Sequence, residues 1–277
     1  MVHTRMSEAI KITPHCILRL TIEIPRWFGY YSSTRQMPLR EIPTARLATP
    51  LHFASRGRDN GGAASFSNVA RLLLEHGADV NARAIDNITP LHEAVRDGRV
   101  EAIRALLELG ADINDRKDDD STLLHKAAIY GSIEAIRLLV ELGADVNARK
   151  NDDTTPLHQA ALFGSVTAIR VLLELGADIN ARKNDDTTPL HEAALYGCFG
   201  VICVLAELGA DVNARKNDNT TALHQAALYG KVVVIHMLLK HGANVGVVDG
   251  RGRTPSQLAS KRGYNDIIAL LSEHATR

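Results

Sequence analysis

Histidine is the residue type that first suggests chemistry in this sequence, because the chain of 277 residues contains twelve of them. Imidazole is a common metal ligand and the usual general base near neutral pH. Six of the histidines recur along the chain, at positions 52, 92, 125, 158, 191 and 224. If each lies on its own helical layer, neighbouring rings are roughly 10 Å apart, whereas ligands of one zinc ion all lie about 2.1 Å from it. The spacing therefore predicts a structural row of histidines and no metal site.

The other reactive side chains also lack the neighbours that catalysis requires. The three cysteines, Cys16, Cys198 and Cys203, form no Cys-x-x-Cys pair and have no neighbours that would lower a thiol pKa. The acidic run at 118–120 lacks the alternating oxygen ligands and the glycine of a calcium loop. No Gly-x-Ser-x-Gly, His-Glu-x-x-His or phosphate-binding glycine motif occurs. The sequence predicts no catalytic residue, no cofactor and no enzyme.

Composition narrows the class of protein further. The 32 basic and 32 acidic residues balance, so the basic excess of a general nucleic-acid binder is missing. No run of 18 apolar residues could span a membrane, and the first residues lack the pattern of a secretory signal. We expect a monomer of the cytoplasm, with the nucleus as the alternative compartment, that binds neither nucleic acid nor membrane.

An internal repeat determines the elements that position these residues. Thr-Pro-Leu-His occurs four times, beginning at Thr49, Thr89, Thr155 and Thr188. From Thr89 onward the motif threonines recur every 33 residues, at positions 89, 122, 155, 188, 221 and 254. A second signature, Gly-Ala-Asp-Val/Ile-Asn, keeps the same spacing at glycines 77, 110, 143, 176 and 209. Two signatures in register indicate a stacked repeat architecture.

Each unit carries the signals of two short helices. Thr155 followed by Pro156 is typical of a helix N-cap and its first position. Gly164 predicts the end of that helix, because glycine enters the left-handed region at little cost. A second helix then has apolar residues at i, i+3 and i+4 spacing, at Ile169, Leu172 and Leu173. A single unit cannot cover these faces, so neighbouring units must stack.

These motifs resemble the ankyrin repeat family from Thr49 to the C-terminus. The resemblance implies an all-α fold with short β-hairpins, an ankyrin repeat solenoid of stacked helix-turn-helix units. Seven units begin near Thr49, Thr89, Thr122, Thr155, Thr188, Thr221 and Thr254. The first unit has an insertion of seven residues within 57–64, and the last is a C-terminal cap in which Gln257 replaces the motif histidine. The resemblance also implies that each motif histidine joins its N-cap threonine to the backbone of the adjoining hairpin.

One departure from the family pattern and one charge pattern lead to specific expectations. The family places glycine in the hairpin turn, but this chain has asparagine or aspartate there and keeps only Gly252. Both residues tolerate positive φ, so we expect the turn to persist. On the second helices, Arg104, Arg137 and Arg170 each precede a glutamate by four residues, which predicts exposed pairs within one helix.

Residues 1–48 do not match the repeat and form a separate, partly disordered or docked segment in our interpretation. Seven basic and three acidic residues give it a charge of +4. The alternating residues 18–24 predict a strand that ends at Pro25. The segment is either a partner-specific arm that includes Trp27 or a loosely attached terminus.

The candidate binding site is an apolar series at the end of the first helices. Consecutive units place an aliphatic residue and an aromatic ring at Ile129-Tyr130, Leu162-Phe163, Leu195-Tyr196 and Leu228-Tyr229. The resemblance implies that these positions face a concave groove, flanked by the hairpin tips at Asp119, Asp152, Asp185 and Asp218. The alternative is that these side chains only pack between neighbouring helices.

The sequence therefore predicts a protein–protein interaction scaffold or adaptor. A protein or peptide partner would lie in the groove, with aromatic anchors for affinity and acidic hairpin tips that attract basic residues. The alternative is a regulatory subunit or host-directed effector that uses the same module, with residues 1–48 as a targeting or partner element.

Overall fold

The structure, a computed structural model, describes residues 48–56 and 63–275. The strand expected at 18–24, the arm with Trp27 and most of the insertion predicted at 57–64 lie outside the described residues. Nearly all of the predicted repeat region is within them.

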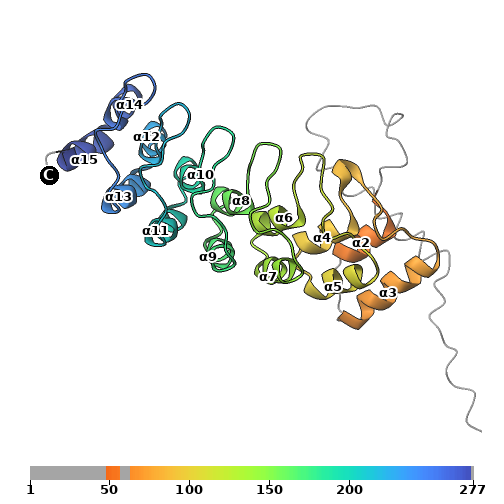
Figure 1. Ribbon diagram of the computed structural model, residues 1–277. Coiled ribbons are helices and arrows are strands. Elements are labelled where there is room, and N and C mark those ends of the chain that lie inside the picture. The colour runs from red at the N-terminus through yellow and green to blue at the C-terminus, as the bar shows by residue number, and fades with distance from the viewer. Residues whose placement is uncertain (1–47, 57–62, 276–277) are drawn as a thin grey trace, which may run out of the picture.

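The described residues form fourteen α-helices arranged as seven antiparallel pairs in two rows (Figure 1). The first helices of the units, here called the inner helices, are α2 (Pro50–Arg56), α4 (Pro90–Arg96), α6 (Leu123–Tyr130), α8 (Pro156–Leu162), α10 (Pro189–Tyr196), α12 (Ala222–Leu228) and α14 (Pro255–Arg262). The outer helices are α3 (Ala63–Glu75), α5 (Val100–Glu108), α7 (Ile133–Glu141), α9 (Val166–Glu174), α11 (Phe199–Glu207), α13 (Val232–Lys240) and α15 (Asn265–Ala275). Each helix packs on the corresponding helix of the next unit, so the predicted solenoid is confirmed.

Each inner helix begins as the motif predicts. In α8, Thr155 has extended backbone angles and forms a capping box with His158, and Pro156 follows as the first helical residue. The next glycine has positive φ, with Gly164 at +74°. Gln257 forms the same capping box with Thr254 in the last unit, so glutamine replaces histidine there without loss of the cap.

Small residues allow the inner helices to pack closely. Ala160 and Ala161 are fully buried in α8, and alanine pairs at the same positions are buried in α6, α10 and α12. Ile169 and Leu172 of the outer helix α9 are buried as well. These apolar residues form one continuous core along the solenoid, which explains how a chain with few aromatic residues can fill its interior.

The segments between units project as narrow loops on the side of the inner helices (Figure 1), and we call them fingers. No strand occurs among the described residues, so the expected β-hairpins are reduced to tight loops. Typically one backbone bond closes the neck, as from Lys150 N to Thr154 O at 3.0 Å. A single antiparallel bridge joins Arg116 to Thr122 within the described part of the chain.

At the position where the family carries glycine, the residue in each finger turn has a positive φ, as the turn requires. Residues there have φ between +54° and +62° at Asn87, Asp120, Asp153, Asp186 and Asn219, while Gly252 has φ +72°. A side chain in this region costs about 1 kcal/mol, which asparagine and aspartate tolerate best. The turn of the first finger includes a short 3₁₀ helix, η4 (Ile85–Asn87).

Three sets of contacts hold neighbouring fingers in register. Backbone bonds connect the tips, for example from Asn184 N to Asp152 O at 3.2 Å. Arginine side chains connect the bases, as Arg149 Nη1 donates to Arg182 O at 3.0 Å. Between these levels, lysines of one finger form ion pairs with aspartates of the preceding finger.

The expected ion pairs within outer helices are not what the structure shows. Arg137 pairs with Glu174 of the next unit at 2.8 Å, and Arg104 lies 3.9 Å from Glu141 of the next unit. The prediction of intrahelical pairs was therefore wrong. Adjacent outer helices lie close enough for the long arginine side chain to reach across, so these pairs connect units.

Candidate functional site

Four rings follow one another along the inner helices, and we call Tyr130, Phe163, Tyr196 and Tyr229 the aromatic row. Each ring is the last residue of its inner helix or the residue directly after it. Their exposed fractions are 55%, 58%, 58% and 49%. None of the four rings is enclosed between helical layers, so all four are accessible to a partner.

The aliphatic residues before the rings behave differently. Ile129, Leu162, Leu195 and Leu228 are only half-buried. The two alanines directly before each of them are fully buried. The aliphatic side chains therefore connect the core to the surface, and the rings are the exposed part of the predicted site.

The predicted hairpin-tip aspartates are mostly engaged with neighbouring fingers. Lysines of the next finger pair with them at 2.7 Å, 3.6 Å and 3.0 Å, in the order Asp119–Lys150, Asp152–Lys183 and Asp185–Lys216. Burial opposes the charged form of Asp185, but hydrogen bonds from Thr187 and Lys216 outweigh it and lower its pKa to about 2. These contacts partly neutralise the tips that we expected to attract basic partners.

Asp218 is the exception among the predicted tips. The position that carries lysine in earlier fingers is Asp249 in the next one, so the next finger offers Asp218 no lysine at this position. Its carboxylate accepts bonds from the backbone and hydroxyl of Thr220, at 3.0 Å and 2.6 Å. Asp218 is therefore the tip residue whose charge is least compensated by the neighbouring finger.

The motif histidines are buried connectors, as the family resemblance implied. Thr155 N donates to Nδ1 of His158 at 3.3 Å, and Nε2 of the same ring donates to Thr187 O in the next unit at 2.9 Å. Burial lowers the pKa of His158 to about 4, because it outweighs the bond to Thr187. A neutral ring satisfies both contacts, so these histidines are structural rather than catalytic.

His92 departs from this pattern because its Nε2 has no hydrogen-bond partner among the described residues. Its neighbour Asp115 is also buried, and one carboxylate oxygen has no hydrogen bond there. Burial raises the pKa of Asp115, although an ion pair with Arg83 opposes the shift. Sequence reasoning missed Asp115; the available signal was its place in the repeat, where Ala148, Ala181 and other units carry alanine.

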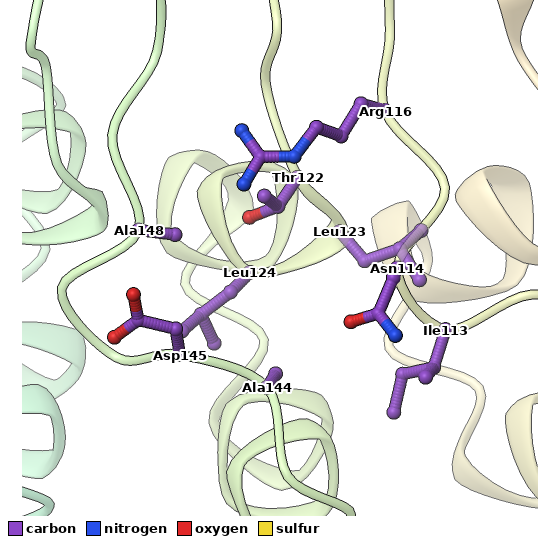
Figure 2. A pocket seen from close by; sticks show the side chains of 9 residues that line it. All are labelled: Ile113, Asn114, Arg116, Thr122, Leu123, Leu124, Ala144, Asp145 and Ala148. Carbon is purple, nitrogen blue, oxygen red and sulfur yellow. The ribbon is translucent and has the colours of Figure 1, made fainter.

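A pocket lies between two neighbouring fingers, at the start of α6 (Figure 2). Asn114 and Arg116 line it from one finger, Asp145 from the next, and Leu124 of α6 lies between them. Tyr130 is at the opposite end of α6. The pocket is thus separate from the aromatic row and gathers no set of catalytic groups.

The described residues provide no further site. No group of three histidine, cysteine or carboxylate side chains in 48–56 and 63–275 comes close enough to hold a metal ion. Within the same residues, no helix is both long and apolar enough to cross a membrane. Cys198 and Cys203 carry free thiols, and burial raises the pKa of Cys198.

Comparisons with known proteins agree with this architecture. A family model described as ankyrin repeats (3 copies) matches residues 39–117, 113–183, 149–216 and 214–277. The crystal structure of the human ASB11 ankyrin repeat domain is similar, with 30% sequence identity and a TM-score of 0.69. That match covers 81% of this chain and 98% of the other. No curated protein matches the chain. The repeat motifs, the stacked helix pairs and these matches together show that the chain belongs to the ankyrin repeat family.

Proposed function

We propose that this protein is an interaction scaffold or adaptor that binds a protein or peptide partner on the face of its inner helices. Ankyrin repeats are in general protein–protein interaction modules, and the proposed module comprises residues 49–277. The observation that carries the proposal is the exposure of all four rings of the aromatic row. Exposed aromatic side chains in one row are costly to leave in water, and they are enriched at interface centres.

The dimensions of the row suit a partner of ordinary size. Inner helices of adjacent units pack about 10 Å apart, so four rings span roughly 30 Å. A standard interface buries about 800 Å² on each partner, which corresponds to a patch of similar width. Aromatic residues carry a large share of binding energy at such interfaces. The aromatic row is therefore the proposed anchor.

The proposal predicts that Tyr196→Ala combined with Tyr229→Ala weakens partner binding by about 1–3 kcal/mol, as other anchor truncations do. The thermal unfolding midpoint should hardly change, because both rings are about half exposed. The measurement is affinity purification with quantitative mass spectrometry, followed by titration of the recovered partner.

Val233→Ala is a matched control, since Val233 is an exposed apolar residue on the outer helix α13. Partners that bind the double variant and the wild-type chain equally well would contradict the proposal. Equal loss with Val233→Ala would place the interface elsewhere on the solenoid.

A further inference from the structure

The face formed by the inner helices, here called the inner face, carries a group of basic residues at its N-terminal end. Four cations lie near one another in units one to three, and we call them the basic cluster: Arg56, Arg96, Lys117 and Lys126. In units four to six leucine stands in place of Arg96 and glutamine or glutamate in place of Lys126, while the position of Lys117 keeps its lysine at Lys150, Lys183 and Lys216. The face is therefore basic at one end and aromatic along the rest.

The acids within the described residues do not fully neutralise this cluster. Glu93 is buried and pairs with Arg56 at 2.7 Å and with Arg96 at 2.8 Å. Asp97 also contacts Arg96, at 2.7 Å. The ion pairs of these acids therefore involve the two arginines of the cluster and neither of its lysines. No ion pair joins Lys117 or Lys126 to an acid in the described part of the chain, and at Lys126 Glu93 only partly offsets burial and the neighbouring cations.

Lys117 differs in this respect from the lysines at its position in the next three fingers. Lys150, Lys183 and Lys216 each pair with an aspartate of the preceding finger. Lys126 in turn is half-buried, and its pKa is lowered by burial and by the neighbouring cations, although Glu93 opposes the shift. A partly desolvated cation among other cations gains more from an added carboxylate than an exposed surface lysine would.

The basic cluster is continuous with the first ring of the aromatic row. Lys126 Nζ lies 6.0 Å from the centroid of the Tyr130 ring, on the same helix. A partner segment that covers Tyr130 would therefore also reach Lys126. From Arg96 in unit two to Tyr229 in unit six there are four steps of about 10 Å, or about 40 Å. An extended peptide advances about 3.3 Å per residue, so about twelve residues would span both regions.

From these observations we propose that the inner face recognises an acidic peptide segment with adjoining apolar residues, whose carboxylates contact Arg96, Lys117 and Lys126 while its apolar side chains contact the aromatic row. This inference rests on the proposed function and adds the chemistry of the partner. It replaces the expectation of a basic partner at the hairpin tips, since three of those tips already pair with lysines.

A random 16-residue peptide library displayed on phage and selected on the full-length chain tests the inference. Selected peptides should carry aspartate or glutamate at one end of an apolar motif. Lys126→Glu should remove this enrichment and weaken the best acidic peptide about tenfold in a fluorescence anisotropy titration. Lys117→Glu, on a finger rather than a helix, should have the same effect if Lys126→Glu impairs folding.

Lys240→Glu is the matched control, because it changes the net charge equally on the exposed end of the outer helix α13. It should leave the selection unchanged. Apolar peptides that require Tyr196 and Tyr229 but show no acidic enrichment would overturn this inference and leave the proposed function standing. Selected peptides that bind the Tyr196→Ala and Tyr229→Ala double variant unchanged would overturn both.

Discussion

The motif histidines other than His92 use their two ring nitrogens in opposite ways. In unit four, Nδ1 of His158 accepts a bond from Thr155 N, so it must be free of a proton, while Nε2 must carry one to donate to Thr187 O. A second proton would remove the acceptor and place a charge in the core. The same bonds to Thr and to the next unit occur at His125, His191 and His224.

This arrangement makes the stability of the solenoid depend on pH. Burial lowers the pKa of His125, His158 and His191 to about 4, whereas histidine in an unfolded chain titrates near 6.5. Between these values the unfolded chain binds protons that the folded chain does not. The free energy of unfolding should therefore decrease as the pH falls from about 6.5 to 4 and be fully retained above that range.

His158→Gln tests this origin of the pH dependence. Gln257 shows that glutamine can form the capping box at this position. We expect the variant to lose up to about 1 kcal/mol per pH unit from the slope of unfolding free energy against pH below 6.5. Urea unfolding at pH 7.5 and pH 5.0 measures it, with the exposed His236→Gln as control. An unchanged slope in His158→Gln would exclude this histidine as a source.

Repetition is the reason why individual residues were predictable here. The roles of Thr155, Gly164 and His158 followed from motifs that recur in several units. Asp115 and Lys126 break the repeat, and their surroundings are set by side chains of other units, such as Arg83 and Glu93. Their burial and charge balance could not be derived from spacing within one unit.

At the level of elements, the outer helices show where a spacing argument reaches its limit. Arg137 has Glu141 on its own helix and Glu174 on the neighbouring one, and the two glutamates occupy the same position in successive repeats. Sequence spacing shows only the first as a neighbour. The structure places the contact with Glu174, because the packing of adjacent helices decides which carboxylate the long side chain reaches.

A double-mutant cycle distinguishes the two pairs. Arg137→Ala with Glu174→Ala should give a coupling energy of about 0.5 kcal/mol in chemical unfolding at low salt, in the range of exposed ion pairs. The cycle of Arg137→Ala with Glu141→Ala should give a value near zero. A larger coupling to Glu141 would restore the original intrahelical assignment.

For the whole molecule, stability is the sum of unit stabilities and unit–unit interfaces. Unit five has weaknesses in both terms. Gly200 is the second residue of α11, and glycine in a helix costs up to about 1 kcal/mol relative to alanine. Cys203 replaces the arginine that connects α5 to α7 and α7 to α9.

Units five and six should therefore open before units three and four. Native-state hydrogen exchange followed by mass spectrometry measures this order, with faster exchange expected for the backbone amides of α11 than for those of α7 and α9. The slowest amides of the chain falling within 200–240 would show that these substitutions do not weaken the local structure.

The contacts between units repeat at constant sequence offsets, and this has a consequence for how such a chain can change its length. His125 and His158 each reach a carbonyl 29 residues further on, and Arg149 and Arg182 each reach one 33 residues further on. Excising residues 155–187, or duplicating them, would present every donor at the new junction with an acceptor of the same kind. Evolution could thus lengthen or shorten the row of rings by whole steps while each junction keeps its chemistry.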